Sequence, residues 1–370
     1  MLLEVRGLAF DVTAGGPPDG RPVVLLHGFP LNRHCWSQVT SLLHAAGLRT
    51  YAVDQRGYSP GARPDGVDAY RLAECVADAL AFVDTLAGGR ADVVGHDFGA
   101  LVGWQLAIDH PSAVRTLTTV SVPHPAAFGH ALLTDPEQQR RSSYFTLFRT
   151  AGKAEHVLTR DGGAALRTML AGAGASRVDV YAAPLLAPGA LTATLNWYRA
   201  MSVADLASAS PVTVPTTYVW GDRDVAVAPT TAEASAAHVT ADYRSVPLAG
   251  VDHWIPDTDP GPLADAILAR LATTDPGRDR TARPVSDRGS LPAVVDPGVP
   301  PAAGGTLPAA GGGAGLPSGV DPDRPVVADG GAHPVAGHAA GPGTGSGVDG
   351  GADLGRRGAG GDTDEESAGS

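Results

Sequence analysis

The segment Gly95-His96-Asp97-Phe98-Gly99 places an acidic residue where a short apolar run meets a helix-like stretch. Its two glycines allow a sharp strand-to-helix turn that exposes the central side chain. A carboxylate at such a turn can displace a leaving group from an sp³ carbon and become an ester, whereas a serine would attack an acyl carbon. Asp97 is therefore a candidate nucleophile for an alkylating electrophile. The alternative interpretation is that Asp97 only caps the following helix.

Candidate partners for Asp97 follow later in the chain. Asp222 and Asp224 come just after a predicted strand, and His253 comes after the last predicted strand. Nucleophile, acid and histidine in this order form a hydrolase triad when a strand-to-helix turn carries the nucleophile. We expect His253 to activate the water that hydrolyses the ester, and one of the two aspartates to orient its ring.

Hydrolysis of such an ester also needs backbone N–H groups that stabilise an oxyanion. Phe98 directly follows the nucleophile, and Phe29 follows the His-Gly turn that ends an earlier predicted strand. The amides of Phe29 and Phe98 are the predicted oxyanion hole. His27 is interpreted as a buried, hydrogen-bonded residue that borders the substrate site, not as a base.

Short β-branched runs alternate with longer amphipathic stretches, which predicts an α/β fold with a mostly parallel sheet flanked by helices. The predicted strands are residues 2–12, 23–26, 50–53, 92–94, 117–120, 216–220 and 243–248, and the predicted helices are residues 37–46, 68–86, 100–109 and 262–272.

The strand rhythm stops over residues 126–206, which we interpret as a helical lid inserted into a core of residues 1–125 and 207–273. Residues 274–370 form a low-complexity tail. Its last 70 residues contain 21 Gly and 7 Pro, and no aromatic residue follows Trp254. Such a segment buries too little apolar surface to offset its chain entropy, so the tail is predicted to be disordered.

Charge and cysteine content restrict the function further. The net charge of −12 argues against a nucleic-acid partner. The two cysteines lack CxxC spacing, so neither a disulfide framework nor a zinc site is indicated, and we expect no metal and no cofactor. Charges near Met1 and the lack of any run of ~20 apolar residues argue against export and against a membrane span. The expectation is a cytoplasmic protein without a membrane partner.

With these residues identified, the chain resembles the epoxide hydrolases of the α/β-hydrolase superfamily over about residues 1–273. The segments that carry the resemblance are HGFP at 27–30, DQRGYSPGARP at 54–64, GHDFGA at 95–100 and NWYR at 196–199. The resemblance implies an α/β-hydrolase fold and conversion of a small-molecule epoxide and water to a vicinal diol, through an ester on Asp97.

The resemblance also implies specific site residues. Two lid tyrosines of this family donate protons to the epoxide oxygen, and they correspond to Tyr198 in NWYR and Tyr144 in the segment SYFTLF at 143–148. Trp197, beside Tyr198, is placed at the substrate site. The Trp-Gly-x-x-Asp spacing of the family selects Asp224 as the acid, with Asp222 as a turn residue. The alternative for both tyrosines is a role as aromatic core residues of the lid.

Phe98 departs from the family pattern, which usually has Trp after the nucleophile, so an altered substrate preference is expected. The alternative enzyme is a dehalogenase of the same fold, but haloalkane dehalogenases bind halide with donor side chains where this chain has Phe29 and Phe98. Fluoroacetate dehalogenases carry Arg after the nucleophile. A second alternative is a hydrolase-like ligand-binding protein without catalysis, which would not need Asp97, Asp224 and His253 together. The sequence does not indicate an oligomeric state.

Overall fold

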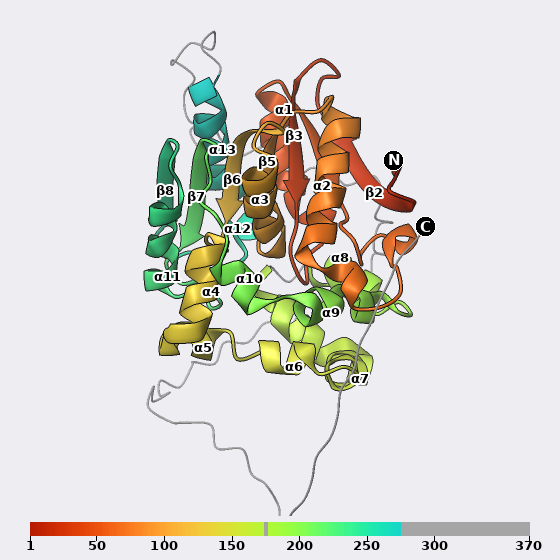
Figure 1. Ribbon diagram of the computed structural model, residues 1–370. Coiled ribbons are helices and arrows are strands. Elements are labelled where there is room, and N and C mark those ends of the chain that lie inside the picture. Colours follow the sequence, from red (N-terminus) through yellow and green to blue (C-terminus); the bar gives the residue numbers. More distant parts are fainter. Residues whose placement is uncertain (174–176, 275–370) are drawn as a thin grey trace, which may run out of the picture. The chain divides into compact units, whose positions relative to one another are not determined.

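A computed structural model describes residues 1–173 and 177–274 of the chain (Figure 1). Their strands form one sheet in the order β1-β2-β4-β3-β5-β6-β7-β8. The pairings from β4 across to β8 are all parallel, whereas β1 pairs with β2 and β2 pairs with β4 in antiparallel fashion at one edge. This arrangement confirms the predicted α/β fold with a mostly parallel sheet. The strands are β1 (Leu2–Val5), β2 (Leu8–Gly15), β3 (Arg21–Leu26), β4 (Leu48–Val53), β5 (Ala91–His96), β6 (Val114–Val120), β7 (Thr216–Gly221) and β8 (Tyr243–Leu248).

The central strands explain why the sequence shows continuous apolar runs instead of alternation. Every residue of β5 and of β7 is buried, because helices cover both faces of a parallel sheet. Helices α2 (Leu72–Ala87) and α3 (Phe98–Asp109) contact each other and cover one face, in front of the sheet in Figure 1. Helices α1 (Ser37–Ala45) and α13 (Pro260–Leu271) contact each other. Helix α1 packs against β4, and α13 packs against β7.

The prediction of one strand over residues 2–12 is wrong. The segment forms an antiparallel hairpin of β1 and β2, with Leu2 opposite Asp11. Its turn is the pair Arg6-Gly7, and both residues have positive φ, at 52° and 75°. Two consecutive residues in this region suit a tight hairpin turn. Arginine rarely adopts this conformation, so the pair did not look like a turn in the sequence.

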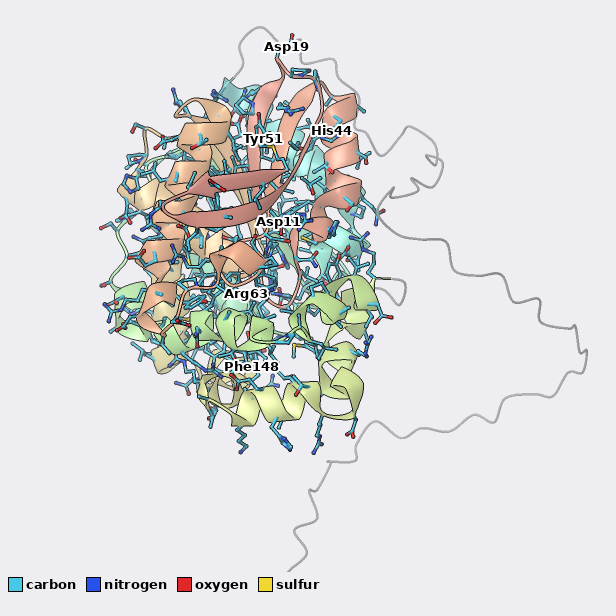
Figure 2. The ribbon with its side chains drawn as sticks, turned by 90° about the vertical axis from the view of Figure 1, so that its right-hand side faces the viewer. Asp11, Asp19, His44, Tyr51, Arg63 and Phe148 are labelled. Atoms are coloured by element: carbon cyan, nitrogen blue, oxygen red, sulfur yellow. The ribbon has the colours of Figure 1, made fainter. Side chains whose placement is uncertain are left out.

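Between β6 and β7, the described residues form helices and no strand. These helices lie at the carboxyl ends of the strands, at the bottom of Figure 1, and Phe148 is labelled among them in Figure 2. The predicted lid limits, residues 126 and 206, fall inside the first and last of these helices. They are α4 (Pro125–Thr134), α5 (Pro136–Arg141), α6 (Phe145–Arg149), α7 (Lys153–Met169, interrupted at residues 160–163), α8 (Val178–Leu185), α9 (Ala190–Ala200) and α10 (Val203–Ala207).

Two further expectations concern the tail and membranes. The predicted disordered tail, residues 274–370, lies outside the described residues except for Thr274. In the described part of the chain, no single helix has both the length and the apolar composition of a membrane span. The helices α8 and α9 reach that length and composition only when they are counted together, and the chain bends by 90° between them.

Candidate active site

Asp97 stands alone between the end of β5 and the start of α3, with φ 53° and ψ −120°. A residue with a side chain is strained at such a φ, and this strain is typical of a nucleophile turn. The two glycines of the motif are required by close backbone contacts. A Cβ on Gly95 would lie 2.2 Å from the carbonyl oxygen of Gly99, and a Cβ on Gly99 would lie 2.2 Å from that of Leu26. The sequence motif therefore encodes the sharp turn that presents Asp97.

The carboxylate of Asp97 is held from two sides. Its Oδ1 accepts the N–H of Phe29 at 2.9 Å, and its Oδ2 lies 3.4 Å from Nε2 of His253. Burial alone would raise the pKa of Asp97, but the hydrogen bond and charge of His253, with the N–H of Phe98, lower it below its usual value. Asp97 is thus ionised at neutral pH. Both predicted oxyanion donors lie at this carboxylate.

Asp224 is the acid that contacts His253. Its Oδ2 lies 2.9 Å from His253 Nδ1, and its Oδ1 accepts the N–H groups of Ala226 and Val227 at 2.7 and 3.1 Å. Asp224 is 1% exposed. Asp222 instead accepts the N–H of Gly250 at the protein surface. The structure therefore brings Asp224 to the histidine and leaves Asp222 in the turn, as the spacing of the resembled family indicated.

His253 lies between the two carboxylates. Burial would lower the pKa of His253, but the charges and hydrogen bonds of Asp224 and Asp97 outweigh burial and raise it to about 10. In the resting site, His253 is therefore an imidazolium at neutral pH. Any change that removes the charge of Asp97 would lower the pKa of His253.

A small cavity opens beside Asp97. Tyr144 and Tyr198 line it, with their ring centres 6.2 Å apart. Neither hydroxyl has a hydrogen-bond partner among the described residues. Burial and the charge of Asp97 raise the pKa of both phenols well above 10, so both stay protonated. The other described lining residues are Phe98, Leu101, Val122, Phe128, Phe145, Met201, Ala226 and Val227.

The lid tyrosines are held by aromatic packing. Tyr198 on α9 meets the ring of Phe29 edge-on, with the ring centres 5.5 Å apart. It also meets Phe145 and Phe148 of α6 at 5.3 and 5.0 Å. Tyr144, directly before α6, packs against the same two rings at 4.9 and 5.2 Å. This cluster fixes both tyrosines above the loop that carries the oxyanion donor.

His27 and Trp197 do not line the cavity, so the structure does not support the predicted contact of their side chains with substrate. His27 is completely buried, and its Nε2 accepts the N–H of Gln55 at 3.1 Å. Its Nδ1 therefore carries the proton and donates to the carbonyl of Gly28 at 3.0 Å. Burial lowers the pKa of His27, which keeps it neutral. Trp197 instead stacks on Phe98, with ring centres 4.2 Å apart.

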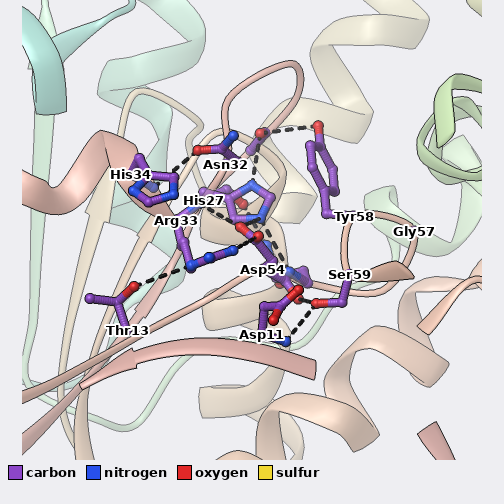
Figure 3. A network of polar contacts seen from close by, with 12 residues as sticks. Asp11, Thr13, His27, Asn32, Arg33, His34, Asp54, Gly57, Tyr58 and Ser59 are labelled. Atoms are coloured by element: carbon purple, nitrogen blue, oxygen red, sulfur yellow. Dashed lines mark hydrogen bonds and ion pairs between the residues drawn. The ribbon is translucent and has the colours of Figure 1, made fainter. Parts of the chain in front are cut away.

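A polar network beneath the oxyanion loop joins two of the sequence motifs (Figure 3). Asp54 accepts the backbone N–H of Arg33 at 2.7 Å and pairs with its guanidinium group. The hydroxyl of Ser59 donates to the backbone carbonyl of Asp54 at 2.8 Å, and the hydroxyl of Tyr58 donates to the backbone carbonyl of Gly28 at 3.4 Å. The segment 54–64 therefore supports the loop that presents Phe29.

Comparison with known proteins identifies the family. The sequence pattern of the family described as alpha/beta hydrolase fold matches residues 21–260. The AB hydrolase superfamily protein YfhM of Bacillus subtilis is 32% identical over 277 residues, which cover 73% of this chain and 96% of that protein. This chain belongs to the α/β-hydrolase family.

Two further relatives of this α/β-hydrolase carry a more specific name. Epoxide hydrolase A of Mycobacterium tuberculosis is 29% identical over 314 residues, with 73% of this chain and 96% of that protein covered. The crystal structure of Epoxide Hydrolase A from Mycobacterium thermoresistibile superposes with a TM-score of 0.65 at 26% identity, and covers 74% of this chain and 97% of that one.

Sequence reasoning missed several parts of the site of this α/β-hydrolase. The amides of Ala226 and Val227, which hold Asp224, have no signature because any residue except proline supplies a backbone N–H. The buried side chain of Gln138 was also missed, since two of its three partners, Ala226 and Ala228, are far away in the sequence. Within the described residues, no cluster of three or more His, Cys, Asp or Glu is placed to hold a metal ion.

Proposed function

We propose that this α/β-hydrolase is an epoxide hydrolase that converts an epoxide and water to a vicinal diol through an ester on Asp97. One observation carries the proposal. Tyr144 and Tyr198, whose hydroxyls have no hydrogen-bond partner among the described residues, line the same small cavity as the ionised, buried Asp97. The two relatives named epoxide hydrolase support the proposal, because the matches cover 96% and 97% of their own lengths.

In the first proposed step, an oxygen of Asp97 forms a bond to an epoxide carbon as the carbon–oxygen bond of the ring breaks. The leaving oxygen stays on the substrate and takes a proton from Tyr144 or Tyr198. A phenol suits this role because it is protonated at neutral pH yet can donate to a strongly basic alkoxide. General acid catalysis of this kind contributes roughly 10²–10⁴ in rate.

The second proposed step begins with the loss of the Asp97 charge on alkylation. One of the two carboxylates that raise the pKa of His253 is then gone, so His253 can return a proton to the tyrosinate and become neutral. Neutral His253 accepts a proton from water, whose oxygen attacks Cγ of Asp97. The amides of Phe29 and Phe98 stabilise the oxyanion. The diol then leaves with the proton of His253, and the new carboxyl group of Asp97 re-protonates the histidine.

The cavity favours a neutral, apolar epoxide. Among its described lining residues, Asp97 is the sole charged one, and the others apart from the tyrosines are apolar. A halide leaving group would need N–H donors from side chains, and Phe29 and Phe98 have none. A non-catalytic binder would not need an ionised Asp97 next to His253 and Asp224. These observations favour the epoxide over both alternatives.

Single-turnover reaction of styrene oxide in ¹⁸O-labelled water tests the proposal. The first diol should contain an unlabelled oxygen that came from Asp97, and the label should appear in Asp97. Direct entry of label into the first diol would contradict the covalent route. Halide release from haloalkanes without diol formation from a panel of aliphatic and styrene-type epoxides would favour a dehalogenase. An Asp97→Ala variant should form no diol.

A further inference from the structure

Gln138 on α5 is a completely buried polar side chain that uses its whole amide group in hydrogen bonds. Its Oε1 accepts the N–H of Ala228 at 2.9 Å, and its Nε2 donates to the carbonyl of Ala226 at 2.8 Å and to Oγ of Ser142 at 2.9 Å. Two of these partners belong to residues 224–228, which we call the acid turn. Buried amide groups are expensive unless paired, so this pairing fixes the relative position of α5 and the acid turn.

Ala226 of the acid turn connects Gln138 to the triad, because its backbone N–H and its backbone carbonyl each make one hydrogen bond. The N–H of Ala226 donates to Oδ1 of Asp224, while its carbonyl accepts from Gln138. The other carboxylate oxygen of Asp224 orients His253. A displacement of Ala226 would therefore move the group that sets the ring position of His253.

Other contacts of α5 reach the same turn. Arg141 donates to the backbone carbonyl of Asp224, and Thr230, just beyond the turn, donates to Asp135 at the start of α5 at 2.9 Å. The third partner of Gln138, Ser142, lies two residues before Tyr144. Gln138 thus joins the lid segment that carries a proposed proton donor to the loop that carries the acid.

We infer that Gln138 is a positioning residue for ester hydrolysis, which acts by holding the acid turn so that Asp224 orients His253. The inference rests on the proposed epoxide hydrolase function. Water activation requires His253 in place, whereas ring opening uses Asp97 and the tyrosines. Loss of the Gln138 contacts should therefore slow the second step more than the first. A misplacement of about 1 Å can cost roughly a hundredfold in rate.

The test compares Gln138→Met with Gln139→Met in the full-length protein. Methionine matches glutamine in length but makes no amide hydrogen bonds, and Gln139 is the exposed neighbour on the same helix. Ester formation and ester decay on Asp97 are followed by rapid quenching and mass spectrometry with styrene oxide. We expect Gln138→Met to accumulate the ester, with decay slowed by about ten- to a hundredfold, and Gln139→Met to behave as the unmodified protein. Ser142→Ala, which removes only the third bond, should change decay little.

The pH dependence of ester decay separates positioning from a purely structural role. Asp224 raises the pKa of His253, so a loosened acid turn should shift the rise in decay rate to lower pH. Equal slowing of both steps without this shift, or no slowing, would overturn the inference. If Gln138→Met does not fold, Gln138→Leu, which is also apolar and lacks the amide group, is measured in the same way. Absence of any ester and diol in the unmodified protein would instead refute the proposed function.

Discussion

Substitution of Asp224 by Asn removes the charge that faces His253 Nδ1 while leaving an oxygen for the amides of Ala226 and Val227. The amide would present a donor or a weaker acceptor to the ring, so His253 would lose both its orientation and the stabilisation of its charged form. Asp224 is 1% exposed, so water cannot replace the lost contact. Breaking a buried charged pair costs about 3–5 kcal/mol.

If this free energy is lost from the transition state of ester hydrolysis, the rate of ester decay falls by about 10²–10⁴, because each 1.36 kcal/mol of barrier corresponds to a tenfold change in rate. The assay is single turnover of styrene oxide with the ester on Asp97 followed by mass spectrometry. We expect the ester to form and persist in Asp224→Asn. Asp222→Asn is the matched control, since Asp222 contacts Gly250 and not the histidine. Normal diol release by Asp224→Asn, or equal loss in Asp222→Asn, would refute the reasoning.

Four further outcomes are expected. Tyr144→Phe and Tyr198→Phe should each slow ester formation but not ester decay, by about tenfold or more per lost acid, and unchanged single-turnover rates would contradict the proton-donor roles. The pKa of His253 is raised in the folded protein to about 10, so the protonated ring stabilises the fold fully below about pH 6.5 and this stabilisation is lost as pH rises toward about 10. The melting temperature should therefore fall less over this pH range in His253→Gln than in the unmodified protein. Met201 lines both the cavity and a larger surface groove, so Met201→Ala should increase kcat/KM for long-chain relative to short-chain terminal epoxides, and an unchanged ratio would show that the two spaces do not communicate. A chain that ends at Thr274 should retain the activity and melting temperature of the full chain, and a loss of either would show that the remaining residues support the core.

Much of the fold was predictable because the relevant signals are local. The fully buried strands β5 and β7 appear as apolar runs, and the turn around Asp97 needs glycines that are visible in the sequence. The hairpin at residues 2–15 was missed because its turn depends on an arginine in an uncommon conformation. Local patterns therefore identified most core strands but not every connection.

The sequence by itself determined the candidate nucleophile, the histidine and the class of fold, because residue type and short spacing carry that information. For Asp222 and Asp224, which are two residues apart and chemically identical, the family spacing favoured Asp224, and only the tertiary structure showed its contact with the histidine. It buried His27 in hydrogen bonds with the backbone and stacked Trp197 on Phe98, and it brought Gln138 to the acid turn. Each of these outcomes depends on which atoms of distant segments come into contact when the chain packs. The distances and orientations between such segments cannot be read from any short stretch of sequence.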